Sequence, residues 1–153
     1  MDPKTKQAKK IAQILKMFFI LAGLMFVYIA FKFPPQRITS TQPAFELIIS
    51  AVALIDVALG FILPGVLVRS ALRAESGTRQ SSTPIQRWFS GYVLSLAMFE
   101  SCILFGLVLH FMGSRVLIVE VLAAAGLLAM LIRSPGSPPA DYDVSNSQIQ
   151  GDS

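Results

Sequence analysis

Two acidic residues in the middle of long apolar runs are the residues of this sequence best suited to chemistry. Glu100 lies near the centre of residues 88–112, WFSGYVLSLAMFESCILFGLVLHFM, and Asp56 lies near the centre of residues 44–67. An ionised carboxylate at such a depth in a bilayer would cost several kcal/mol. Each acid therefore predicts a functional site, at which the carboxylate would hold a proton or a sodium ion.

The composition indicates that these runs lie in a membrane. The 153 residues are 54% hydrophobic and only 14% charged, whereas a soluble domain has about 25% charged residues. The net charge of +4 does not indicate nucleic acid, because the Lys and Arg residues flank apolar runs, where topology and anionic headgroups explain them. We therefore expect one small membrane domain with the lipid bilayer as its surroundings.

Four apolar stretches predict an all-α fold, an integral membrane four-helix bundle spanning residues 11–132. The helices are expected at residues 11–33, 44–67, 88–112 and 116–132, the last of which is short. A helix rises about 1.5 Å per residue, and the hydrocarbon core is about 30 Å thick. Residues 1–10 read as a basic cytosolic leader, and residues 133–153, rich in Pro, Ser, Gly and Asp, as a disordered tail.

Prolines mark the expected helix boundaries. Pro34, followed by a second proline, ends the first helix. Pro43 and Pro84 suit the first turns of the second and third helices. Pro64 should kink the second helix, because it leaves the carbonyl of Gly60 without its usual partner.

Small residues predict where helices pack closely. Ala53 and Gly60 lie about one turn on either side of Asp56, so a neighbouring helix could approach that carboxylate. Gly113 and Ser114 suit a C-cap followed by an N-cap, which predicts an antiparallel hairpin of the third and fourth helices. The fourth helix carries Ala123, Ala124, Ala125, Gly126 and Ala129, which allow close packing in lipid.

The Lys and Arg residues predict the orientation of the chain. If both termini are cytosolic, only Lys32, Arg37 and Arg115 of the 13 basic residues lie outside. This distribution satisfies the positive-inside rule and suits a bacterial inner membrane. Lys16 lies within the first apolar run and is expected to extend its amine toward the membrane surface.

Asp56 and Glu100 are expected at similar depth, because the second and third helices run in opposite directions. They could meet, and no Lys or Arg lies at that depth in any span. A protonated acid or a bound cation would then be the low-energy state. The alternative is two separately buried acids, each bonded to a backbone carbonyl or to Ser95 or Ser101.

His110 and Glu120 form a second candidate pair nearer the outer face. They could pair across the hairpin and relay protons toward Glu100. His110 is, however, rotated by roughly 80° from the Glu100 face of its helix, at about 100° per residue, which does not support a direct path. The alternative is an interfacial histidine and a glutamate near water.

Other site chemistry has little support in the sequence. One histidine and one cysteine cannot form a zinc site by themselves. Cys102 reads as a small buried apolar residue. No cofactor is evident, and no Ser-His-Asp spacing or phosphate-binding glycine loop is present, so the sequence gives no basis for an enzyme.

Residues 97–111, AMFESCILFGLVLHF, resemble the carboxylate-bearing helix of the rotor-ring proteolipids of F-type and V-type ATPases. The matching residues are Ala97, Glu100, Ser101, Gly106, Leu107 and Val108. The resemblance implies that Glu100 is a reversible proton or sodium site. Four spans in 153 residues also suit the duplicated V-type form, although the first two helices lack its glycine repeat.

These features predict a small multi-pass membrane protein that works as a homo-oligomer or with other membrane subunits. In the first hypothesis, its membrane-buried carboxylate binds or relays a proton or cation. In the alternative, it is a structural accessory subunit whose acids only stabilise helix packing.

Overall fold

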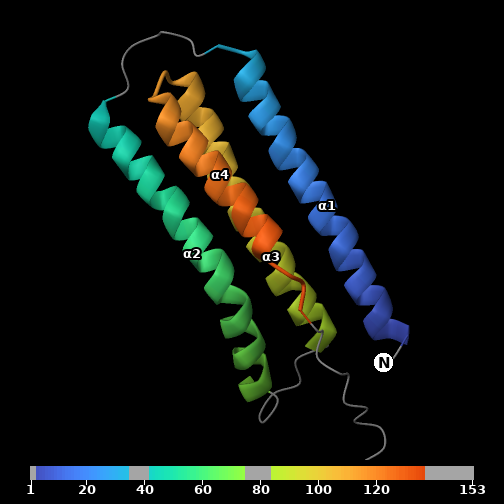
Figure 1. Ribbon diagram of the computed structural model, residues 1–153. Coiled ribbons are helices and arrows are strands. Elements are labelled where there is room, and N and C mark those ends of the chain that lie inside the picture. The colour runs from blue at the N-terminus through green and yellow to red at the C-terminus, as the bar shows by residue number, and fades with distance from the viewer. Residues whose placement is uncertain (1–2, 35–41, 75–83, 137–153) are drawn as a thin grey trace, which may run out of the picture.

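All regular structure in the described residues is α-helical. The computed structural model describes residues 3–34, 42–74 and 84–136. Its helices are α1 (Pro3–Lys32), α2 (Pro43–Ala74), α3 (Pro84–Phe111) and α4 (Val116–Ile132) (Figure 1). The predicted all-α class is therefore confirmed. The tail beyond residue 136 and the side chains of Arg37 and Arg79 lie outside the described residues.

The helix boundaries follow the prolines, with two extensions. α2 begins at Pro43 and α3 at Pro84, as expected, and α1 ends just before Pro34. However, α1 already begins at Pro3, and α2 runs on to Ala74. The added turns are rich in Lys, Ala, Leu and Arg, which favour helix in water as well as in lipid. The apolar runs thus predicted the membrane part of each helix, whereas helix propensity continues the helices beyond it.

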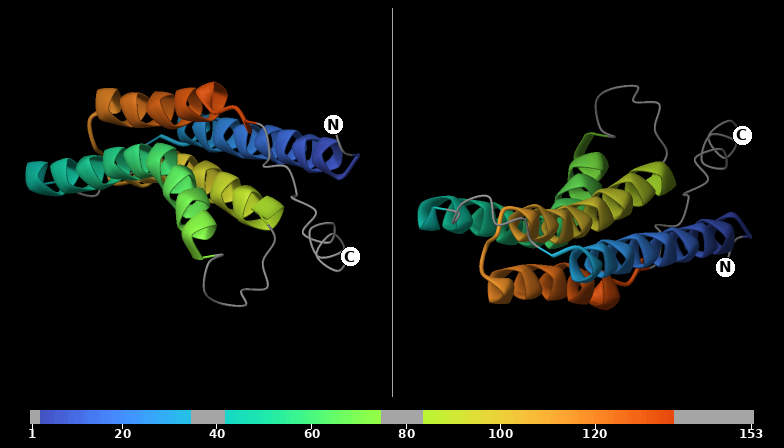
Figure 2. Two further views of the ribbon diagram at one scale, coloured as in Figure 1. Left: turned by 90° about the horizontal axis from the view of Figure 1, so that it is seen from below. Right: turned by 90° about the horizontal axis from the view of Figure 1, so that it is seen from above.

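The other three helices pack around α3, and the four together form an arc that is open on one side. α3 contacts α1, α2 and α4, and α4 also contacts α1 and α2. Within the described residues, α1 and α2 do not contact each other (Figure 2). One face of α3, the face between α1 and α2, is therefore left uncovered by the described residues.

The turn between α3 and α4 forms the predicted antiparallel hairpin. Gly113 has a φ of 78°, a left-handed conformation that favours glycine. Its N–H donates to the carbonyl of His110, and the N–H of Ser114 donates to that of Leu109, both at 3.0 Å. The N-cap of α4 is Arg115 rather than the expected Ser114, because Ser114 completes the C-terminal cap of α3.

The core gathers around Phe99, whose side chain is completely buried between α2 and α4. A Cβ on Gly60 would lie 2.6 Å from the Phe99 ring, and a Cβ on Gly126 would lie 2.7 Å from the Phe99 carbonyl oxygen. Ala129 is also buried, whereas Ala124 is exposed. The close packing predicted for α4 is therefore present along one side of that helix.

α2 bends where the sequence predicted a kink. Pro64 lies inside the helix, and Figure 2 shows α2 turning in its C-terminal part. The carbonyl of Gly60 would normally accept the N–H of residue 64, which proline lacks. Ser95 of α3 replaces it, because its Oγ donates to the Gly60 carbonyl at 2.6 Å. The kink is thus stabilised by a hydrogen bond between helices.

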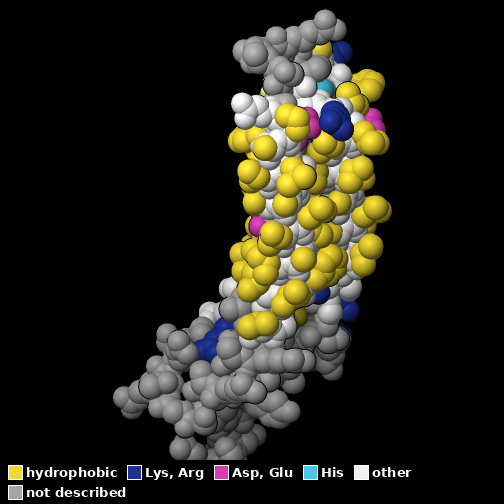
Figure 3. Space-filling view, turned by 90° about the vertical axis from the view of Figure 1, so that its left-hand side faces the viewer, with side chains coloured by type: hydrophobic (Ala, Val, Ile, Leu, Met, Phe, Trp, Pro, Cys, Tyr) yellow, Lys and Arg dark blue, Asp and Glu magenta, His cyan; other side chains and the backbone are white. Residues whose placement is uncertain are grey.

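Three helices are long and apolar enough to cross a membrane, by length and composition. The segments are Lys6–Lys32, Pro43–Val66 and Ile85–Phe111, whereas α4 is a shorter apolar helix of 17 residues. Hydrophobic side chains cover the middle of the molecule, with Lys and Arg toward its ends (Figure 3). Such a surface is typical of a small membrane protein, and lipid or another protein must cover it.

Candidate functional site

Asp56 is held against α3 by a hydrogen bond from Ser101. The Ser101 Oγ lies 2.7 Å from Asp56 Oδ2 and 2.8 Å from the carbonyl oxygen of Met98. The close approach is possible because Ala53 is completely buried and Gly60 has no side chain. The predicted approach of a neighbouring helix to Asp56 is therefore confirmed.

Glu100 lies at the level of this hydrogen bond, one residue before Ser101. Within the described residues, its carboxylate has no hydrogen-bond or ionic partner, and it makes no bond to Asp56. The side chain is half-buried. Sequence reasoning expected an enclosed acid, whereas the chain itself encloses Glu100 only in part.

The neighbours of Glu100 show where its carboxylate lies. Ala97 and Leu104 flank Glu100 on one face of α3 at i−3 and i+4, and both are exposed. Leu94 and Val108 continue this exposed stripe. Glu100 is therefore at the edge of the open face of α3 defined above, at mid-length of an apolar helix.

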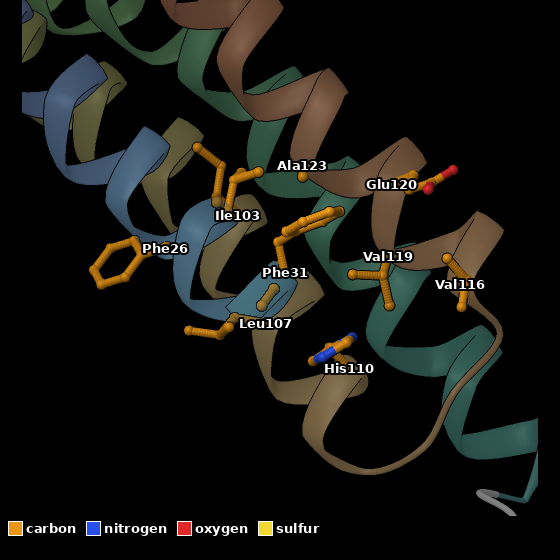
Figure 4. Close-up of a pocket in the computed structure, with 11 residues that line it drawn as sticks. Phe26, Phe31, Ile103, Leu107, His110, Val116, Val119, Glu120 and Ala123 are labelled. Atoms are coloured by element: carbon orange, nitrogen blue, oxygen red, sulfur yellow. The ribbon is translucent and has the colours of Figure 1, made fainter. Parts of the chain in front are cut away.

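His110 and Glu120 line a common cavity, but they do not pair. The cavity of about 200 Å³ lies among α1, α3 and α4. His110 Nε2 donates to the carbonyl oxygen of Phe33 at 2.8 Å, which ties the end of α1 to the end of α3. Glu120 is exposed, and Figure 4 shows its carboxylate directed away from the imidazole. A proton relay through these two residues stays a prediction.

Of the four carboxylates in the described residues, the buried one is Glu46, which sequence reasoning missed. Its side chain lies at the N-terminus of α4, where Oε1 accepts the N–H of Arg115 at 3.1 Å. Glu46 Oε2 lies 3.9 Å from Arg115 Nε. The Arg115 side chain is 76% exposed, so this ion pair contributes little. The main effect is a negative charge at the positive end of the helix dipole.

Lys16 acts at the opposite end of α4. Its Nζ donates to the carbonyl oxygens of Leu131 and Arg133, each at 2.9 Å. The sequence suggested that Lys16 extends toward the membrane surface, but its amine satisfies backbone carbonyls at the end of α4. The Glu46 carboxylate therefore lies at the N-terminus of α4 and the Lys16 ammonium at its C-terminus. The helix dipole favours a negative charge at the first position and a positive charge at the second. Only the spatial order of the helices reveals these partners.

Replacing Glu46 with alanine is expected to lower the free energy of unfolding by about 1 kcal/mol, because the N-terminus of α4 loses its cap. Glu46→Gln keeps an acceptor oxygen and should cost about half as much. Titration with sodium dodecyl sulfate in mixed micelles, followed by circular dichroism, measures both. Glu120→Ala, at an exposed acid of the same helix end, is the matched control. An equal effect of the two alanine variants would contradict the cap.

Comparison of the chain with protein-family models, with curated proteins and with solved structures gives no match. The class that its helices define is a small membrane protein.

Proposed function

We propose that this protein is a four-span membrane subunit in which Glu100 reversibly binds a proton or a cation. The observation that carries the proposal is a carboxylate at mid-length of an apolar helix that has no partner among the described residues. It lies at the edge of a face that these residues leave open. In a bilayer that face meets lipid or another subunit. Since an unpaired charge there is costly, a proton or a cation neutralises Glu100.

α4 completes the four spans of this proposal, with both termini in the cytosol. Its 17 residues measure about 25 Å, slightly less than the hydrocarbon core of about 30 Å. The contacts of Glu46 and Lys16 support a spanning helix, because they satisfy backbone groups at its two ends. In Figure 1 the start of α1 lies at the lower end of the molecule and α4 runs downward toward that end, as an even number of spans requires.

Asp56 is the second acid of the proposed site. The Ser101 hydroxyl has one hydrogen but lies within bonding distance of two acceptor oxygens, those of Asp56 and Met98. A proton on Asp56 would allow the acid to donate to Ser101 Oγ while Ser101 donates to Met98. Both hydrogen bonds would then be made without a movement of the helices.

The open face of α3 supports a role in an assembly. Four helices leave little room for a path through one chain, so ion transfer requires further copies or other membrane subunits. The resemblance of residues 97–111 to rotor-ring proteolipids agrees with this role, since it assigns the reversible site to Glu100.

Labelling with a hydrophobic carbodiimide, which reacts with protonated carboxyl groups in apolar surroundings, tests the proposal. We expect the full chain in membranes to be labelled at Glu100, with labelling decreasing at alkaline pH, and Glu100→Gln to abolish it while the helix content stays unchanged. Protection by sodium would identify a cation site. Glu120→Gln, at an exposed acid outside the proposed site, is the control and should keep most of the label. An unlabelled wild-type chain across the pH range would contradict the proposal.

A structural accessory subunit is the second candidate, favoured by the hydrogen bond between Asp56 and Ser101, which joins α2 to α3. In that case Glu100→Gln should be silent, whereas Glu100→Leu should disturb assembly. Native mass spectrometry of the detergent-extracted protein distinguishes the two candidates through the stoichiometry of each variant.

A further inference from the structure

Three residues with hydrogen-bond donors in their side chains lie near the end of α4, where it packs beside the middle of α1. They are Lys16 of α1, Tyr92 of α3 and Arg133, which directly follows α4. The Lys16 ammonium donates to the carbonyl oxygen of Arg133 at 2.9 Å. Tyr92 also packs in one buried cluster with Ala12 and Met130, one turn from Lys16 and Arg133 respectively.

Two of these donors are buried without an acceptor. Tyr92 is 2% exposed, and within the described residues neither its hydroxyl nor the Nε of Arg133 has a hydrogen-bond partner. Trp88 stacks on Tyr92, with ring centroids 6.1 Å apart and planes 7° apart, which holds the phenol in place. A buried donor without a partner costs free energy, so the described residues leave this cluster in need of an acceptor.

No carboxylate of the described residues can supply that acceptor. The structure describes four acids, and all of them are elsewhere: Glu46, Asp56, Glu100 and Glu120. Glu46 and Glu120 lie toward the opposite end of the molecule, and Asp56 and Glu100 lie at mid-length. The cluster of Lys16, Tyr92 and Arg133 is therefore positive and rich in donors.

We propose that Lys16, Tyr92 and Arg133 bind a phosphate group. Phosphate oxygens accept charge-assisted hydrogen bonds from an ammonium, a guanidinium N–H and a phenol O–H. The phosphate belongs either to the headgroup of an anionic lipid or to free phosphate. The level of the site suits a headgroup, because Trp88 is an aromatic of the kind found at the membrane interface, and basic pockets between helices bind such headgroups. This site is independent of Glu100 and of the function proposed above.

Native mass spectrometry of the full-length chain in detergent tests the proposal with three probes: phosphatidylglycerol, phosphatidylcholine of the same acyl chains, and inorganic phosphate. We expect phosphatidylglycerol to bind at least about tenfold more tightly than phosphatidylcholine. Tyr92→Phe and Arg133→Gln should each weaken this binding by about tenfold, which corresponds to one charge-assisted hydrogen bond.

Two matched variants and the ligand-free stability separate binding from a structural role. Tyr28→Phe changes an exposed tyrosine of α1, and Lys32→Gln changes an exposed lysine; both should leave binding unchanged. Because the Tyr92 hydroxyl has no partner in the described chain, Tyr92→Phe should not destabilise the lipid-free protein.

The probes also identify the source of the phosphate. Tyr92-dependent binding of phosphatidylglycerol that inorganic phosphate does not displace identifies a lipid headgroup, whereas Tyr92-dependent binding of inorganic phosphate alone identifies the free ion. Equal binding of the two lipids together with no binding of phosphate would overturn the proposal, and so would a Tyr92→Phe variant that binds as tightly as the wild type.

Discussion

Gly126→Ala is expected to lower the free energy of unfolding by about 1–3 kcal/mol, the range typical of overpacking in a close-packed core. The added Cβ would lie 2.7 Å from the Phe99 carbonyl oxygen and 2.6 Å from Ile103 Cγ1. The carbonyl belongs to the backbone of α3 and cannot rotate away, so α4 must move outward. Unfolding with sodium dodecyl sulfate in mixed micelles measures the loss.

Gly65→Ala is the matched control for this variant. Gly65 also lies inside a helix, but nothing is within 4 Å of the position of its Cβ. Because alanine favours helix more than glycine does, Gly65→Ala should be neutral or slightly stabilising. If Gly126→Ala were equally harmless, the close contact between α3 and α4 at Phe99 would be wrong.

Ser95→Ala is expected to lower the free energy of unfolding by about 1–2 kcal/mol, because it leaves a buried backbone carbonyl without a donor. The Ser95 hydroxyl donates to the Gly60 carbonyl oxygen at 2.6 Å, in place of the N–H that Pro64 lacks. The same change should cost much less in a Pro64→Ala background, since the restored N–H of residue 64 can bond to Gly60.

A double-mutant cycle of Ser95→Ala and Pro64→Ala measures this coupling in mixed micelles. Ser90→Ala, at an exposed serine of the same helix, controls for the loss of a hydroxyl. Equal losses for Ser95→Ala in both backgrounds would show that the hydrogen bond does not compensate for the proline.

The sequence was enough to predict how deep in the membrane the candidate site lies. It was not enough to predict the contacts of the site residues. Asp56 and Glu100 each lie near the centre of an apolar run, and the two runs form antiparallel helices. Both acids are therefore expected near the middle of the membrane. Ser101, named among the possible partners of a buried acid, does bond to Asp56. The sequence could not predict that Glu100 lacks a partner in the described chain, because this depends on α1 and α2 failing to meet.

The partners of Glu46, Lys16 and His110 could not be predicted for a related reason. Each bonds to backbone atoms of a distant segment: Glu46 to Arg115, Lys16 to Leu131 and Arg133, and His110 to Phe33. Backbone groups give no residue-specific signal in a sequence. Such contacts follow only from the register and spatial order of the helices.

Local features of the sequence were enough to predict the all-α class and the three long apolar segments. They also predicted the helix boundaries at prolines, the kink at Pro64 and the glycine turn before α4. These are local properties, set by apolar length and by the backbone chemistry of proline and glycine. The tertiary structure alone decided which faces of the helices pack and which stay open. The physical reason is that lipid is as apolar as a helix interface, so hydrophobicity marks the helices that enter a membrane but not the faces that they turn toward one another.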